Sequence, residues 1–437
     1  MGTIGGISRR EFGKLTGAAA ASLWVPVAYA QGAGKVVVIG GGAGGATVAH
    51  YVKKGAPNLD VTLIEVNPIY NSSFFSNLYI GGFRPLESLN HSYSGLTRLG
   101  IKVVHDYATD VDTTKKTVRT RGGRTYSYDK LVISPGIDIK YDAIKGYSRE
   151  AARIMPHAYT TDAAGKRLLK RQLQTMRDGG TVVMVTPADP YRCPPGPYER
   201  ACMIAHFLKT KKPKSKLVIL EPKKGFSKQP VFTEAFERHY KDIIELNQTN
   251  DIDDFAVVSV DPKTKEIVTK AGKKVKADVA NVIPPQRAGE IAAKAGTTEG
   301  DWCPINPENF SSKKVKDVYL VGDATIAAPM PKSAFSANSQ AKVVVADILA
   351  ELAKKDKFEA RYRNTCWSLL APDDDVKIGA NYAPKDGKLE ASGGFVSQRG
   401  EAADVRKANY QESIGWYNGI TAEMFAKTPP PAEQKKG

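Results

Sequence analysis

Two of the four cysteines stand in surroundings that could give their sulfur atoms chemistry. Cys193 lies in Y-R-C-P-P-G-P-Y-E-R, residues 191–200, directly before a stretch that is typical of a helix with Pro197 in its first turn. A helix N-terminus stabilises a thiolate, and Glu199 in the first turns could accept a proton. Cys366 lies far along the chain in N-T-C-W-S-L-L. The spacing alone does not pair these cysteines, and a structural disulfide is an equal interpretation of Cys193.

The other two cysteines are expected to pack in the interior. Cys202 lies in A-C-M-I-A on the same helix, and Cys303 lies in D-W-C-P. No C-x-x-C occurs, which excludes a thioredoxin-type motif, a c-type haem attachment site and a four-cysteine zinc site. The six histidines are scattered along the sequence, so we expect no metal site.

The elements that must position these side chains begin with a glycine-rich turn. Residues 35–39 read K-V-V-V-I, which suits a strand buried on both faces, and Gly40, Gly42 and Gly45 then fill G-x-G-x-x-G. The N-terminus of the following helix would bind a pyrophosphate, and Glu65, after a second strand at 61–64, would bind a ribose hydroxyl. The predicted nucleotide contacts here are Gly40, Gly42, Ala43, Gly44, Gly45, Glu65, Val66 and Asn67.

Two later segments favour FAD over NAD. Residues 128–136 are typical of a buried strand that ends in a tight turn at Pro135 and Gly136, and residues 318–324 contain a strand that ends in Gly322 and Asp323. Both resemble the returning segments of the glutathione-reductase-like flavoproteins, which have two dinucleotide-binding domains. The resemblance implies that Asp323 binds the flavin ribityl chain.

The second nucleotide-binding unit is expected to lack its nucleotide. After a strand at 181–185, the turn carries Pro187, Pro190, Pro194, Pro195 and Pro197 in place of a glycine-rich loop. Prolines have no N–H to donate, so a pyrophosphate could hardly bind, and an NADH-dependent reductase is disfavoured.

The sequence therefore predicts an α/β fold of two Rossmann-like domains and an α+β C-terminal domain. An FAD-binding domain would span 31–150 and 275–350, a second Rossmann-like domain without an NAD(P)H site 151–274, and a C-terminal interface domain 351–437.

The first thirty residues are typical of an export signal. Ser8-Arg9-Arg10-Glu11-Phe12-Gly13-Lys14 is a twin-arginine pattern, followed by a weakly apolar stretch that ends in A-Y-A at 28–30. Because this route exports folded proteins, it predicts a periplasmic protein that is loaded with its cofactor before export.

Composition excludes several other classes of protein. The chain has 437 residues, of which 42% are hydrophobic and 25% charged, which is typical of a folded protein and excludes disordered and multi-span membrane chains. The net charge of +17 comes from dispersed lysines, so we expect no nucleic-acid partner. The polar end at 426–437 does not resemble a membrane anchor, so no integral membrane contact is expected.

The combination resembles the flavoprotein subunit of flavocytochrome c sulfide dehydrogenase, among the relatives of sulfide:quinone oxidoreductase. The matching segments are N-S-S-F-F-S-N-L-Y-I-G-G at 71–82, the 191–200 block, D-W-C-P at 301–304, G-D-A-T-I-A-A-P-M-P-K-S-A-F-S-A-N-S-Q, which begins at Gly322, N-T-C-W-S-L-L-A-P, which begins at Asn364, and W-Y-N at 416–418.

The resemblance implies a redox-active disulfide between Cys193 and Cys366 over the flavin, with Glu199 as an acid beside it. It also adds flavin contacts at Ser73, Asn77, Lys332, Ser333 and Trp416, with Lys332 near the N1–C2 edge of the flavin. Family members with a covalent flavin carry a cysteine where this chain has Ser73, so we predict non-covalent FAD.

These parts imply how hydrosulfide would be oxidised. Hydrosulfide attacks the disulfide, and the freed thiolate passes two electrons to the flavin. We expect Cys366 to lie closer to the flavin, and a c-type cytochrome, as a subunit or a soluble protein, to take the electrons. The alternatives are a sulfide:quinone oxidoreductase and another periplasmic FAD-dependent disulfide oxidoreductase.

Overall fold

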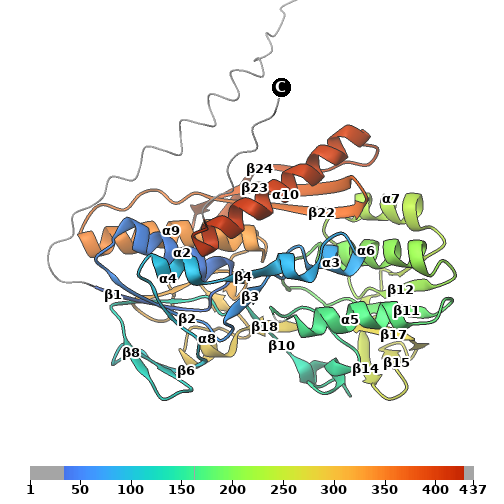
Figure 1. Ribbon diagram of the computed structural model, residues 1–437, viewed down its shortest axis with the longest axis horizontal. Helices are drawn as coiled ribbons and strands as arrows, with labels where there is room; N and C mark the ends of the chain where they lie inside the picture. The colour runs from blue at the N-terminus through green and yellow to red at the C-terminus, as the bar shows by residue number, and fades with distance from the viewer. Residues whose placement is uncertain (1–33, 162, 428–437) are drawn as a thin grey trace, which may run out of the picture.

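A five-stranded parallel sheet forms around the K-V-V-V-I strand (Figure 1). The computed structural model describes residues 34–161 and 163–427, so the predicted export signal and the residues after 427 lie outside the described part. The strand order is β20-β9-β1-β2-β5, and Val36–Val38 are almost fully buried, as the unbroken β-branched run predicts. The bounds are β1 Lys35–Ile39, β2 Asp60–Ile64, β5 Lys102–Val104, β9 Lys130–Ile133 and β20 Val318–Leu320.

Helices α2 (Ala43–Gly55) and α9 (Ala334–Ala353) pack against each other beside this sheet. Strand β20 pairs with β9 although almost two hundred residues separate them along the chain. The chain therefore returns to the first sheet at β20.

A second parallel sheet has the order β13-β12-β11-β17 and lies on the right of Figure 1. Its bounds are β11 Thr181–Val185, β12 Lys216–Leu220, β13 Ile244–Asn247 and β17 Val279–Val282, with helices α5 Ala164–Thr175, α6 Gly196–Lys211 and α7 Gln229–Tyr240. Helix α6 begins where the proline-rich segment predicts it and has a proline in its first turn.

The C-terminal part is an antiparallel sheet of β22 Tyr362–Ala371, β23 Asp374–Lys385 and β24 Lys388–Val396, followed by helix α10 Ala403–Phe425. Asp386 and Gly387 both have positive φ and close the β23–β24 hairpin, which suits the right-handed twist of the strands. This part contacts α2 and α9 on one side and α6 and α7 on the other, and Figure 1 shows it lying across both halves. It can therefore bring a side chain of β22 to the junction of the two sheets.

Short elements complete the fold. The small strands are β3 Ile69–Asn71, β4 Asn90–Ser92, β6 Ala108–Asp112, β7 Thr117–Thr120, β8 Thr125–Ser127, β10 Ile137–Ile139, β14 Val257–Asp261, β15 Glu266–Thr269, β16 Lys274–Lys276, β18 Gln286–Ala288, β19 Cys303–Pro304 and β21 Thr325–Ile326. The short helices are α3 Ser76–Gly81, α4 Ser94–Arg98 and α8 Glu290–Lys294, with 3₁₀ turns Leu86–Leu89, Tyr141–Ala143, Ala151–Arg153 and Ile252–Asp254. None of the helices in the described part combines the length and the hydropathy that crossing a bilayer requires.

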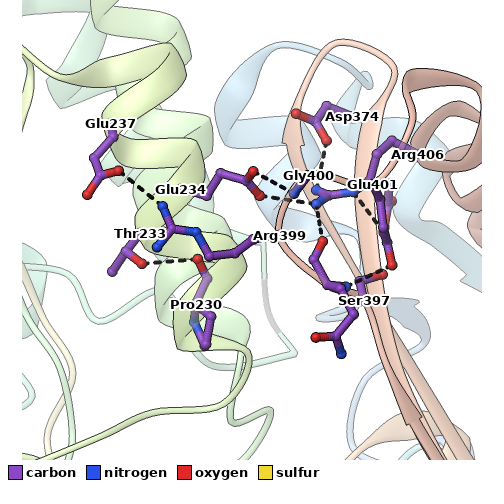
Figure 2. A network of polar contacts seen from close by, with 12 residues as sticks. Pro230, Thr233, Glu234, Glu237, Asp374, Ser397, Arg399, Gly400, Glu401 and Arg406 are labelled. Carbon is purple, nitrogen blue, oxygen red and sulfur yellow. Dashed lines mark hydrogen bonds and ion pairs between the residues drawn. The ribbon is translucent and has the colours of Figure 1, made fainter.

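A polar network fastens the C-terminal part to helix α7 (Figure 2). The buried guanidinium of Arg406 pairs with Asp374 at 3.1 Å, with Glu234 at 3.3 Å and with Glu401 at 2.8 Å. Because Glu234 belongs to α7 and Arg406 to α10, the ion pairs cross the junction. The nearby pair of Arg399 and Glu237 is exposed, so it contributes little.

Candidate active site

One cavity collects side chains from both sheets and from the C-terminal part. It is lined by Gly40, Gly42, Ala43, Gly44, Glu65, Tyr70, Ser73, Phe74, Phe75, Ser76, Asn77, Leu78, Ser134, Pro135, Gly136, Ala158, Tyr159, Thr161, Arg192, Cys193, Gly196, Glu199, Arg200, Gly322, Asp323, Ser333, Ala334, Phe335, Ala337, Thr365, Cys366, Trp367, Asp375, Ser413 and Trp416. Most of the residues predicted from the sequence are therefore in one place.

The glycine-rich turn has the shape that a bound pyrophosphate needs. A Cβ on Gly40, which has φ +94°, would lie 2.2 Å from the Ser134 carbonyl oxygen, and a Cβ on Gly45 would lie 1.9 Å from that of Gly40. Only glycine fits these positions, so the backbone can turn sharply and α2 can approach β1 closely. Gly45 therefore allows α2 to pack closely on the turn after β1, and it does not line the cavity.

Glu65 holds this turn together. One of its carboxylate oxygens accepts a hydrogen bond from the Gly41 backbone N–H at 2.7 Å, and the other accepts from the Asn67 backbone at 2.8 Å. Glu65 lines the cavity, whereas Asn67 and the half-exposed Val66 do not.

Unpartnered polar atoms show that the cavity suits a flavin nucleotide. Within the described residues, Asp323 Oδ1, Tyr159 Oη and Trp367 Nε1 are buried without a hydrogen-bond partner, and all three residues line the cavity. A carboxylate oxygen that is buried without a donor is costly, and a ribityl hydroxyl would satisfy it. Burial raises the pKa of the Asp323 carboxyl, against the charges of Arg192 and Lys332. These residues fit FAD.

Lys332 is placed differently from the prediction. Its ammonium donates to the backbone carbonyls of Asp323 at 2.8 Å and Thr325 at 2.7 Å and lies 3.7 Å from the centre of the Trp302 ring. It does not line the cavity. Burial lowers the pKa of Lys332 to about 8. Lys332 therefore holds the loop that contains Asp323, on the side away from the cavity. The two carbonyl groups and the face of the Trp302 ring are the partners of its ammonium.

Cys193 and Cys366 meet at this cavity from different elements. Cys193 precedes α6, and its backbone N–H donates to the Lys332 carbonyl at 2.8 Å, whereas Cys366 lies in the middle of β22. Both are unbonded thiols in the structure. Cys202 and Cys303 are fully buried elsewhere, as expected.

The electrostatic surroundings of Cys193 differ from the prediction. Burial, together with the neighbouring Cys366 and Glu199, raises the pKa of the Cys193 thiol to about 12, against the charges of Arg192 and Lys228. The expected stabilisation of the thiolate by the helix N-terminus is therefore outweighed by the loss of solvent. Burial also raises the pKa of the Cys366 thiol, while a hydrogen bond with Asn364 and the charge of Lys228 lower it.

Glu199 is a partly buried acid beside the cysteines. Burial raises the pKa of its carboxyl, against hydrogen bonds from the Asn77 side chain at 2.6 Å and from the Leu369 backbone at 3.1 Å. Asn77 in turn accepts from Arg200 at 3.0 Å. A carboxyl with a raised pKa that is held in this way can take and return a proton beside the cysteines.

Two residues at this site were missed from the sequence. The Lys228 ammonium donates to the Cys366 carbonyl at 3.2 Å, to Ser368 Oγ at 2.8 Å and to the Val376 carbonyl at 3.2 Å. Asp375 lines the cavity, and burial raises the pKa of its carboxyl to about 8, against the Lys228 charge. Lys228 had no motif to identify it, while three successive acids at 373–375 were the signal for Asp375.

Aromatic side chains close another part of the cavity. The Trp416 ring from α10 stacks on Phe335 at 6.0 Å between centroids and 5° between planes, and lies 5.3 Å from the Trp367 ring. Ser73 lies nearby in the lining, and its hydroxyl donates to the Thr160 carbonyl at 3.1 Å.

Three backbone N–H groups of the proline-rich turn donate to partners within the protein. The Arg192 backbone donates to Gln286 at 2.9 Å, the Cys193 backbone to Lys332, and the Gly196 backbone to the Cys193 carbonyl. These three groups already have partners within the protein.

Comparisons with known proteins find two related kinds of sulfide-oxidising flavoprotein. Residues 166–284 match the family model described as the central part of the sulfide dehydrogenase [flavocytochrome c] flavoprotein chain, and residues 358–425 match the flavin-binding part of flavocytochrome c sulphide dehydrogenase. The flavoprotein chain of this dehydrogenase from Chlorobaculum thiosulfatiphilum is 46% identical over 46 residues, which are 10% of this chain and 96% of that sequence.

Relatives match over greater lengths at lower identity. The sulfide-quinone reductase of Aquifex aeolicus is 24% identical over 421 residues, which cover 89% of this chain and 93% of the relative. The X-ray structure of the sulfide:quinone oxidoreductase from the same bacterium superposes with a TM-score of 0.70 at 20% identity, covering 92% of this chain and 94% of that one. This chain is therefore an FAD flavoprotein that is related to flavocytochrome c sulfide dehydrogenase and sulfide:quinone oxidoreductase.

Proposed function

We propose that the protein is an FAD-dependent sulfide dehydrogenase that oxidises hydrosulfide through Cys193 and Cys366 and passes the electrons to a c-type cytochrome. The observation that carries the proposal is the meeting of the two cysteines, from separate parts of the chain, at the cavity that fits the flavin. The family matches support sulfide oxidation by a flavoprotein, and the cysteine chemistry and the acceptor are our proposals.

The two cysteines would work as a disulfide. Hydrosulfide attacks one sulfur, the S–S bond breaks, a persulfide forms on the attacked cysteine and the other cysteine leaves as a thiolate. The sulfide sulfur loses two electrons and the disulfide gains two. FAD in the cavity would accept this electron pair when the cysteine pair is oxidised again.

Glu199 would manage the protons of this exchange. The persulfide and the leaving thiolate form beside its partly buried carboxyl, whose raised pKa suits it to hold a proton. Asn77 and the Leu369 backbone orient the carboxyl, and Lys228 places positive charge beside Cys366.

The flavin would be held without a covalent bond. Ser73 lies in the cavity lining, but a hydroxyl cannot form the thioether that a cysteine at the matching position makes. The turn that would bind the pyrophosphate is shaped by Gly40, Gly45 and Glu65. The carboxylate of Asp323 would bind the ribityl chain.

A quinone is the alternative electron acceptor, and the long matches to sulfide:quinone oxidoreductases favour it. The acceptor is tested by supplying sulfide under anaerobic conditions with either oxidised cytochrome c or a short-chain ubiquinone. The proposal predicts cytochrome reduction at least ten times faster than quinone reduction at equal acceptor concentration. Faster quinone reduction would replace it with the alternative.

We also propose that the reaction takes place in the periplasm. The support is the twin-arginine pattern at 8–14 with the A-Y-A segment at 28–30. N-terminal sequencing of the protein from a periplasmic fraction should find a mature chain that begins near Gln31, whereas an uncleaved chain in the cytoplasm would contradict the proposal.

A further inference from the structure

A second cavity lies against Cys366, apart from the cavity that fits the flavin. It has a volume of about 670 Å³. It is lined by Pro194, Pro195, Ser227, Pro329, Pro331, Asn364, Cys366, Ile378, Gly379, Ala380, Tyr382, Gly394, Phe395, Val396 and Gln398. Among the described residues, Cys366 is the one that lines both cavities, whereas Cys193 lines only the first.

The strand register explains how Cys366 reaches the second cavity. Cys366 pairs with Ile378 on β23, and Ile378 pairs with Val396 on β24. Residues that lie directly opposite in an antiparallel sheet share a face, so these three side chains form one row along the cavity. The neighbours of Cys366 in β22, Thr365 and Trp367, line the first cavity instead.

The lining of the second cavity carries no charged side chain among the described residues. Its four prolines also lack the N–H groups with which backbone loops bind anions. A ligand with several charges, such as sulfite or glutathione, would therefore lose its water without gaining a partner. Neutral hydrogen sulfide, singly charged hydrosulfide and sulfane sulfur are small and suit such a lining.

We propose that the second cavity admits inorganic sulfide to Cys366, holds the persulfide formed there and disfavours multiply charged acceptors. The inference rests on the proposed sulfide dehydrogenase function and adds the entry side and the substrate class. Hydrosulfide attacks Cys366 Sγ of the disulfide, the S–S bond breaks, and Cys193 leaves as the thiolate in the first cavity. This order reverses the sequence-based expectation that Cys366 is the cysteine nearer the flavin.

The same cavity would supply the second hydrosulfide. It attacks the outer sulfur of the Cys366 persulfide, forms a new S–S bond and releases disulfane, while Cys366 leaves as a thiolate. No electrons are gained or lost overall in this exchange, because one S–S bond replaces another.

Gly394 allows the cavity to be filled without disturbing the fold. A Cβ at Gly394 would meet its nearest heavy atom, the Gly379 carbonyl oxygen, at 3.9 Å, and the residue is exposed on the edge strand β24. Gly394→Trp should therefore block the cavity. Ala391→Trp places the same ring on the same strand outside this lining and serves as the matched control.

Two readouts test the proposal in the FAD-loaded protein. The first is the rate of anaerobic flavin bleaching by sulfide, and the second is the rate at which N-ethylmaleimide alkylates Cys366 in the reduced protein, read by peptide mass spectrometry. Gly394→Trp should slow both at least tenfold, and Ala391→Trp should slow neither by more than twofold. Unchanged rates of both in Gly394→Trp would overturn the inference. If sulfide fails to bleach even the unaltered protein, the proposed function fails, while alkylation still reports access to Cys366.

A substitution at the rim of the second cavity tests whether the cavity selects its ligand by charge. Val396 is 40% exposed and lines the cavity, so Val396→Glu and Val396→Gln can be compared at equal side-chain volume. Sulfide should bleach the flavin of the Glu variant at least five times more slowly than that of the Gln variant, because the carboxylate repels hydrosulfide. The rates are compared well above neutral pH, where hydrosulfide predominates over neutral hydrogen sulfide, and equal rates there would contradict the proposal that the uncharged lining selects the substrate.

Discussion

Replacing Lys228 with methionine tests whether its charge controls the reactivity of Cys366. Methionine has a similar length but no charge, and it removes the hydrogen bonds to the Cys366 carbonyl, Ser368 Oγ and the Val376 carbonyl. Lys228 contributes a charge that lowers the pKa of the Cys366 thiol, which burial raises. Losing that charge should raise the thiol pKa further.

The size of the effect follows from the position of the ammonium. Lys228 Nζ lies 3.2 Å from the carbonyl oxygen of Cys366 itself. An opposite charge close to a thiol favours its thiolate, and each tenfold change in that equilibrium corresponds to about 1.4 kcal/mol. Losing the Lys228 charge should therefore raise the pKa of the Cys366 thiol and slow its alkylation at a fixed pH below the pKa about tenfold or more.

The assay is the pH dependence of Cys366 alkylation by iodoacetamide in the anaerobically reduced protein, read by peptide mass spectrometry. Ser368→Ala is the control, because it removes one acceptor of Lys228 and leaves the charge in place. The Lys228→Met profile should move to higher pH and the Ser368→Ala profile should move by less than about half a unit. An unmoved profile in a Lys228→Met protein that still binds flavin would refute the reasoning.

Three further results are expected. Arg406→Met leaves buried acids unpaired, so it should lower the free energy of unfolding in urea by about 3–5 kcal/mol. Arg399→Met, at an exposed ion pair, should lower it by less than about 1 kcal/mol. Equal losses in the two variants would contradict the argument from burial. Because burial raises the pKa of Asp375 from 3.8 to about 8, the folded protein keeps a proton that the unfolded chain loses. Its unfolding free energy should therefore fall as pH rises through this window, and Asp375→Asn should flatten that slope; a slope unchanged in the variant would show that another group causes it. Acid precipitation should release the flavin into the supernatant because Ser73 cannot bind it covalently, and a yellow pellet would disprove non-covalent binding.

Local patterns predicted the elements that carry the site. The buried β-branched run gave the position of β1, and the proline in the first turn marked α6. These features depend on neighbours in the sequence, so they can be read directly from it. The glycine-rich turn at 40–45 likewise predicted where FAD would bind.

Contacts between distant segments could not be predicted in this way. Lys228 reaches Cys366 only because the C-terminal sheet packs against α6 and α7, and no local pattern marks that packing. Lys332 was placed beside the flavin by resemblance, but nearby carbonyl groups hold its ammonium elsewhere. The raised thiol pKa of Cys193 depends on its loss of solvent contact and on its neighbours Cys366 and Glu199, which are brought together only in the folded chain.

The central claim is that Cys193 and Cys366 together carry electrons from sulfide to the flavin. Anaerobic titration with sulfide, followed by flavin absorbance in the unaltered protein and in Cys193→Ser, tests it most directly. The account predicts rapid bleaching in the unaltered protein and a loss of at least a thousandfold in rate in Cys193→Ser, with flavin content and fold retained. Bleaching of Cys193→Ser at an unchanged rate would contradict the account.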